Sequence, residues 1–118
     1  MSEITLPELS SRLDDLAILD VRRDYEYDGS FGSPCDPRQG HIPGAINLAL
    51  EEMMALPEPE LRDRLGLAEG AEVVAYCHSG QRSALAVTIL RQLGFNARNY
   101  VGSWHEWSRS DEPIEALA

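Results

Sequence analysis

The stretch EVVAYCHSGQR, residues 72–82, decides the fold of this chain. Residues 73–76 are apolar and rich in strand-forming side chains, as expected of a strand that is buried on both faces. A polar run at 77–81 follows, and apolar side chains then recur at helical spacing over residues 82–93. The helix is predicted to present Leu85, Ile89 and Leu93 as one stripe, with Ala86 and Leu90 beside it. Gly94 is expected to end the helix.

The same alternation of strand and helix extends in both directions from this stretch. Thr5 and Glu8 form the pattern of a capping box, which predicts the start of a first helix. Ser103 is expected to cap the last helix. Apolar strands that alternate with helices predict an α/β fold, a mostly parallel sheet covered on both faces. The further strands are predicted at 16–21, 45–48 and 97–101, and the further helices at 6–13, 22–27, 49–56, 58–65 and 103–108.

Composition indicates one domain and sets limits on its partners. The 118 residues suit a single domain, 1–118. The net charge of −10 comes from 20 acidic residues and 10 basic ones, all of them Arg, so nucleic acid is not an expected partner. No apolar run is long enough to span a membrane, and Met1–Thr5 lacks the basic start of a secretory signal, which favours a cytoplasmic protein.

The cysteines and histidines do not have the spacing of a metal site. Cys35 and Cys77 lie far apart, and no Cys-x-x-Cys is present. His41, His78 and His105 are scattered, so neither zinc nor another metal is expected. Residues 28–40 are predicted to form a loop because Gly and Pro recur in them. Cys35 in this loop is interpreted either as an incidental exposed thiol or as a resolving thiol toward Cys77.

Cys77 has the surroundings of a reactive thiol. It follows a buried strand directly and precedes a helix, at the carboxyl edge of a parallel sheet, where ligands bind in open α/β folds. Backbone N–H groups at the helix start, together with Arg82, favour an anion there and lower the pKa of a thiol. Gly80 lets the backbone curl around the sulfur. The alternative, a buried and inert Cys, requires none of these polar neighbours.

The ordered set of motifs in this chain resembles the rhodanese (thiosulfate sulfurtransferase) family over nearly its whole length. The resemblance implies a rhodanese-like α/β domain with a mostly parallel five-stranded sheet and helices on both faces. It is closest to the catalytic half of two-domain sulfurtransferases. The motifs that carry it are DVR at 20–22, EY at 26–27, GHIPGAIN at 40–47, YCHSGQRS at 76–83, LGF at 93–95 and YVGSWHEW at 100–107.

The family resemblance implies that Cys77 is a nucleophile that cycles between thiolate and persulfide. Thiosulfate or a similar small anionic donor would supply the sulfur, and a thiol, cyanide or protein acceptor would remove it. No metal or organic cofactor is expected. The neighbouring residues have expected roles in the site: Arg82 and Arg22 in donor binding or in carboxylate pairs, Asp20 in ordering the loop, and His78, Ser79, Gly80 and Gln81 in lining the active-site loop.

Three alternatives to a sulfurtransferase stay open at this point. One is a persulfide carrier that passes sulfur to a protein partner. A second is a non-catalytic module, which the presence of Cys77 disfavours. The third is a phosphatase or arsenate reductase of the same fold, whose loop has one residue more between Cys and Arg. Only four residues separate Cys77 from Arg82 here, which suits a single sulfur atom better than a tetrahedral oxyanion.

Overall fold

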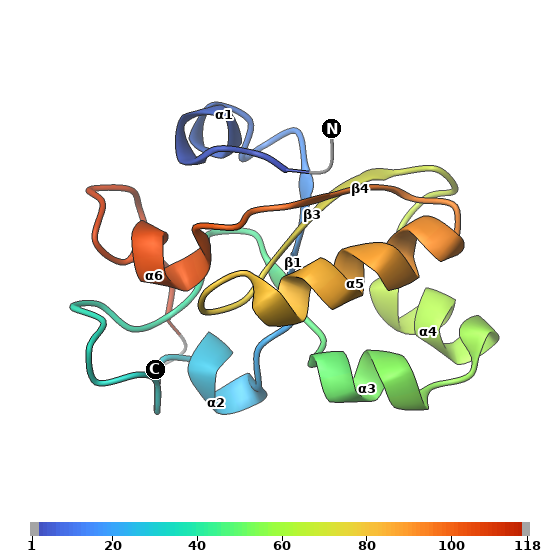
Figure 1. Cartoon of the computed structure of the whole chain (residues 1–118), viewed down its shortest axis with the longest axis horizontal. Coiled ribbons are helices and arrows are strands. Elements are labelled where there is room, and N and C mark those ends of the chain that lie inside the picture. The colour runs from blue at the N-terminus through green and yellow to red at the C-terminus, as the bar shows by residue number, and fades with distance from the viewer. Residues whose placement is uncertain (1–2, 117–118) are drawn as a thin grey trace.

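The computed structural model describes residues 3–116 and shows a parallel sheet between two layers of helices (Figure 1). The strand order is β2-β1-β3-β4, and every neighbouring pair is parallel. The strands are β1 (Ala17–Asp20), β2 (Ile46–Asn47), β3 (Glu72–Tyr76) and β4 (Asn96–Asn99). The helices are α1 (Leu6–Ser11), α2 (Asp24–Tyr27), α3 (Leu50–Ala55), α4 (Glu58–Leu65), α5 (Gln81–Gln92) and α6 (Ser103–Trp107).

Each face of the sheet buries its own apolar core, as predicted for strands that are apolar on both sides. Alternate side chains of a strand point to opposite faces. Val73 and Ala75 therefore join the core under α3, α4 and α5. Val74 and Tyr76 join the core under α1 and α6, which also contains Trp104 and Trp107. Figure 1 shows α3, α4 and α5 below the sheet, α1 above it, and α6 to the left of the strands.

The sheet has four strands within residues 3–116, one fewer than the five predicted. Glu3 makes an isolated parallel bridge to Asn99 beside β4, and Ile4 N–H donates to the Asn99 carbonyl at 3.1 Å. The chain thus runs along the open edge of β4 for the length of one bridge. Pro7 at the start of α1 turns the chain away into a helix soon afterwards, since Pro is favoured in a first helical turn.

Two predicted helix caps differ in the structure. Thr5 accepts a hydrogen bond from the N–H of Glu8 as expected, but the Glu8 carboxylate binds Arg98 at 2.7 Å instead of completing the capping box. Ser103 is not a cap but the first residue of α6, with a φ of 54°. Its hydroxyl donates to the Tyr100 carbonyl, because the chain turns sharply between β4 and α6.

The stripe predicted for α5 also differs, by a rotation of the helix. Leu85 is 44% exposed, whereas Leu90 is fully buried. The side chains that face the sheet are those of Ser83, Ala86, Val87 and Leu90. Gly94 does end the helix as predicted, with a φ of 95° that favours glycine.

Candidate active site

The turn between β3 and α5 holds Cys77 at the carboxyl edge of the sheet. β3 lies in the middle of the sheet, between β1 and β4, so its end is enclosed on both sides. Cys77 is only 1% exposed. Its backbone carbonyl accepts from Trp104 N–H and its N–H donates to the Ser103 hydroxyl, at 2.9 and 3.1 Å. The start of α6 therefore fixes the nucleophile's backbone.

Three donor groups surround the Cys77 sulfur. The N–H groups of Gly80 and Ser83 lie 3.1 and 3.4 Å from Sγ, and the Ser83 hydroxyl lies 3.4 Å from it. Burial by itself raises the pKa of a thiol, but the hydrogen bonds from Ser83, and from the backbone of Ser79 and Gly80, outweigh burial. The pKa of Cys77 is held below its ordinary value. A larger thiolate fraction at neutral pH follows, and the thiolate is the nucleophile.

Gly80 is required by the shape of this turn. Its φ is 91°, in the left-handed region that favours glycine. A Cβ at this position would lie 2.7 Å from the Val101 carbonyl oxygen. The Asn99 side-chain amide donates to the Gly80 carbonyl at 3.1 Å, so β4 also supports the turn. The backbone N–H of Gly80 is thereby aimed at the sulfur.

Arg82 lies beside the turn, but its charge is already paired. Its guanidinium binds the Glu26 carboxylate through two hydrogen bonds, at 2.9 and 3.2 Å. The Asp20 carboxylate takes no part in this pair, because it binds Arg22. The hydrogen bond to Glu26 raises the pKa of Arg82, and this effect is larger than the opposite effect of burial. An anionic donor would have to share Arg82 with Glu26 or displace the carboxylate.

Arg22 and Asp20 form a buried pair, which is the second of the two roles expected for Arg22. Arg22 is 1% exposed and contacts the Asp20 carboxylate at 2.7 Å. It also donates to the Gly40 carbonyl at 2.6 Å and lies over the Trp104 ring. The Tyr76 hydroxyl donates to the same carboxylate at 2.7 Å. Asp20 thus holds the side chain of Arg22, and Arg22 in turn contacts the loop at Gly40. The loop-ordering role of Asp20 stays a prediction.

The remaining predicted residues of the active-site loop form the outer wall of the turn. Ser79 and Gln81 are exposed, and His78 is half-buried. A cavity of about 440 Å³ lies next to His78 and Arg82. Residues of α2 and residues 31–34 line the rest of it. Arg23 and Glu51, also in its wall, pair with each other at 3.0 Å. His78 and Arg82 thus form one wall of this cavity, and Cys77 is not among the residues that line it.

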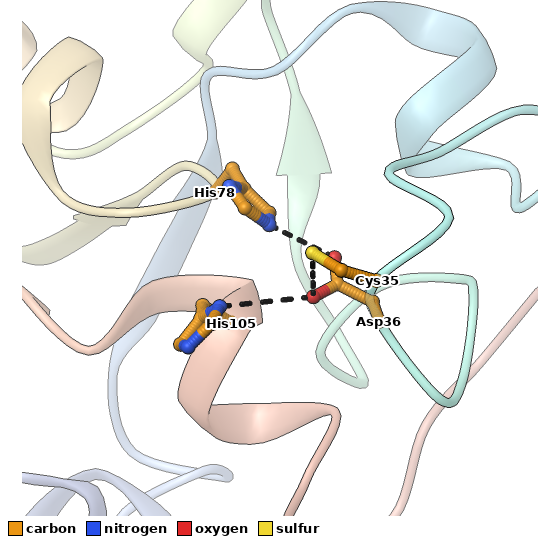
Figure 2. Close-up of side chains that lie close together, drawn as sticks. All are labelled: Cys35, Asp36, His78 and His105. Carbon is orange, nitrogen blue, oxygen red and sulfur yellow. Dashed lines mark hydrogen bonds and ion pairs between the residues drawn. The ribbon is translucent and has the colours of Figure 1, made fainter.

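The fold brings Cys35 into a cluster that the sequence spacing did not predict. Its sulfur lies with side chains of Asp36, His78 and His105, and the four potential ligand atoms are within 4.8 Å of one another. Figure 2 shows these side chains converging from residues 28–40, the active-site loop and α6. Among the described residues, the Cys35 sulfur contacts Ser33 and Asp36 but not Cys77. The interpretation of Cys35 as a resolving thiol therefore gains no support from a contact.

Two supporting residues were missed by sequence reasoning. Ser83 is fully buried and gives two of the contacts to Sγ. Its place in the first turn of α5, where N–H groups are free, was the signal that pointed to it. Ser103 had been assigned to a helix cap, and no sequence pattern indicated that its hydroxyl binds the Cys77 backbone.

Comparisons with known proteins agree on one family. Residues 5–110 match the model of the Rhodanese-like domain. A thiosulfate sulfurtransferase of Azotobacter vinelandii is 37% identical over 112 residues, which cover 86% of this chain and 40% of that protein. A sulfur carrier protein of Thermus thermophilus, TtuD, is 35% identical over 77% of this chain and 38% of its own length.

A solved structure of a probable thiosulfate sulfurtransferase is 45% identical, with a TM-score of 0.85 over 97% of this chain and 47% of that one. The chain thus spans less than half the length of these three relatives. Within residues 3–116, the structure contains no helix long and apolar enough to cross a membrane.

Proposed function

The chain belongs to the rhodanese-like domain family, and from this premise we propose that it is a sulfurtransferase that carries sulfur as a persulfide on Cys77. The observation that carries the proposal is the ring of donors around the Cys77 sulfur, with the lowered pKa that results from it. An inert buried thiol needs no such donors. The names of the relatives, thiosulfate sulfurtransferase and sulfur carrier protein, support the same chemistry.

The first half-reaction loads the sulfur. The Cys77 thiolate attacks the outer sulfur of thiosulfate, the S–S bond of the donor breaks, and sulfite leaves with the electron pair of that bond. One S–S bond forms as one breaks, so no oxidant or reductant is needed. The persulfide anion places its charge on the outer sulfur, and preorganised N–H groups of the turn stabilise such a charge.

The second half-reaction removes the outer sulfur. A nucleophilic acceptor, either cyanide or a thiolate, attacks it, and Cys77 leaves as a thiolate. Cyanide gives thiocyanate. The depressed pKa of Cys77 makes its thiolate a better leaving group in this step. A general base is unnecessary when Cys77 is already ionised, so His78 has no required proton-transfer role.

A persulfide carrier for a protein partner is the second candidate. The relative named as a sulfur carrier favours it. Both candidates share the Cys77 persulfide, so they differ only in how quickly small acceptors discharge it. A steady-state assay with thiosulfate and cyanide separates them: an enzyme turns over many times, whereas a dedicated carrier loads once and discharges slowly.

The phosphatase alternative has less support from the geometry of the turn. The N–H groups of Gly80 and Ser83 point at Sγ itself, at 3.1 and 3.4 Å. A phosphoryl group would bring three further oxygens, each requiring donors. We therefore propose sulfur transfer over phosphate-ester hydrolysis. The cytoplasmic location predicted from the sequence stays a prediction.

The intermediate can be tested by intact mass. Thiosulfate should add the mass of one sulfur atom to the wild-type chain, and cyanide should remove it and release thiocyanate. The Cys77→Ser variant should gain no mass, because an alcohol is not ionised at neutral pH. The Cys35→Ser variant is the matched thiol control and should load normally. Recovery of the added sulfur on Cys35, or on neither thiol, would contradict the proposal.

A further inference from the structure

The cluster of Cys35, Asp36, His78 and His105 has the chemistry of a metal site. It offers one thiolate, one carboxylate and two imidazoles, a donor set that suits a tetrahedral Zn²⁺-type ion. The four potential ligand atoms lie within 4.8 Å of one another. The ligands come from three separate parts of the chain (Figure 2), so only folding brings them together.

Asp36 gives an independent indication of a ligand. Its side chain is 1% exposed, and its Oδ2 atom has no hydrogen-bond partner. The other carboxylate oxygen, Oδ1, accepts from Arg109 at 2.9 Å. A buried carboxylate oxygen without a hydrogen-bond donor is costly, and such an oxygen favours a water or an ion as its partner. Arg109 therefore holds Asp36 so that Oδ2 is directed into the cluster.

The spacing of His78 and Asp36 fits two ligands of one ion. His78 Nε2 lies 3.0 Å from Asp36 Oδ2, yet the pair lacks the alignment of a hydrogen bond, and neither atom has another partner. Two ligands about 2.0–2.2 Å from a tetrahedral ion lie about 3.3 Å apart. The observed 3.0 Å separation is therefore close to the distance expected between two ligands of one ion.

Cys35 and His105 require only small movements to complete the site. Cys35 Sγ and His105 Nδ1 each lie 3.9 Å from Asp36 Oδ1. The Cys35 residue is exposed and the His105 side chain is 52% exposed, so both can rotate about their side-chain bonds. The Ser33 hydroxyl lies 3.0 Å from the Cys35 sulfur, and Arg109 binds the Cys35 carbonyl at 2.7 Å. Outer contacts of this kind orient metal ligands.

We propose that these four residues bind one Zn²⁺-type divalent ion, which joins residues 28–40 to the active-site loop and α6. The Cys35 thiolate and the Asp36 carboxylate would bring two negative charges to the ion, and Arg109 shares the charge of the carboxylate through its other oxygen. His78 follows the nucleophile, and its carbonyl accepts from His105 N–H at 2.9 Å. The ion would therefore fix the wall of the cavity beside Arg82, which residues 31–34 and His78 line.

The test is metal titration of Cys77→Ser protein, in which sulfur chemistry plays no part. After removal of metal, Zn²⁺ should bind with a stoichiometry of one by calorimetry. Co²⁺ should give tetrahedral ligand-field bands and a thiolate charge-transfer band. A hundredfold excess of free Zn²⁺ over its Kd should raise Tm by roughly 5–10 °C.

Variants on the same background decide the ligands. Cys35→Ser should abolish the charge-transfer band, and His105→Ala should weaken binding at least about tenfold. Both residues are exposed, so neither change should prevent folding, and Asp111→Asn on the same surface is the control. Absence of Zn²⁺ binding, or unchanged binding in Cys35→Ser and His105→Ala, would overturn the proposal. Either result leaves the persulfide test on Cys77 unaffected.

Discussion

At the scale of single residues, the ionisation of Cys77 depends on the small set of groups that contact its sulfur. Burial opposes ionisation of the thiol, and only the hydrogen bonds from Ser83 and the turn reverse that effect. Of these donors, the Ser83 hydroxyl is the one that a side-chain substitution can remove while the backbone stays in place.

The change Ser83→Ala should raise the pKa of Cys77, because it removes a donor that favours the thiolate. The pH midpoint of alkylation by iodoacetamide should then move upward. Ser79→Ala is the matched control, since only the backbone of Ser79, and not its exposed side chain, affects the pKa of Cys77. Equal midpoints for Ser83→Ala and the wild type would assign the stabilisation to backbone N–H groups alone.

Glu26 decides how much of the Arg82 charge reaches a donor. Glu26→Gln should weaken the pair and lower KM for thiosulfate by several-fold, with kcat little changed, if Arg82 contributes ground-state binding. Glu51→Gln removes the same charge from the same cavity but releases Arg23 instead. An equal fall in KM for both variants would indicate a general field effect, and no fall for Glu26→Gln would place Arg82 outside the donor site.

The sequence predicts the nucleophile and its turn, but not the pairing of the charges around it. Cys77 and Gly80 are identified by their place between a strand and a helix, a local feature. Asp20 pairs with Arg22 two residues away, whereas Glu26 pairs with Arg82, and only the fold brings that second pair together. Asp36 contacts His78 because of the path of the loop at residues 28–40. That segment has no periodic pattern from which its path could be predicted.

At the scale of elements, α5 carries both the donors to Cys77 and a large part of one core. Its existence, its length and its end at Gly94 follow from apolar spacing, but the predicted stripe did not fix which side faces the sheet. The stripe through Leu85 is rotated outward, because the small side chains of Ser83 and Ala86 allow the helix start to approach β3 closely. That approach brings the Ser83 N–H to the sulfur.

The orientation of α5 predicts unequal costs for two leucines. Leu90→Ala should lower the free energy of unfolding by about 2–5 kcal/mol, because Leu90 is fully buried. Leu85→Ala, on the same helix, should change it by less than about 1 kcal/mol, because Leu85 is 44% exposed. Urea unfolding measures both. Similar losses would show that the stripe predicted from the sequence, and not the observed face, packs on the sheet.

At the scale of the whole molecule, the buried Asp20–Arg22 pair adds polar contacts between parts that one apolar core already brings together. Asp20 ends β1, Tyr76 ends β3, and Arg22 reaches the Gly40 carbonyl and the Trp104 ring. The sheet edge, the long loop and α6 thus meet at one carboxylate. A buried ion pair adds little net stability over an apolar substitute, but removing one partner leaves an uncompensated charge.

This reasoning predicts that Asp20→Asn destabilises the whole chain although it changes only one atom. The variant should lose about 3–5 kcal/mol of unfolding free energy, since Arg22 keeps its buried charge while the opposite charge that faces it is removed. Asp15→Asn is the matched control: Asp15 is exposed and pairs with Arg12 at 2.8 Å, and its loss should cost less than about 1 kcal/mol. Urea unfolding followed by tryptophan fluorescence reports on Trp104, which lies against Arg22. Equal, small losses for both variants would mean that water reaches Arg22 when its partner is removed, and the loop around Gly40 would then depend on other contacts.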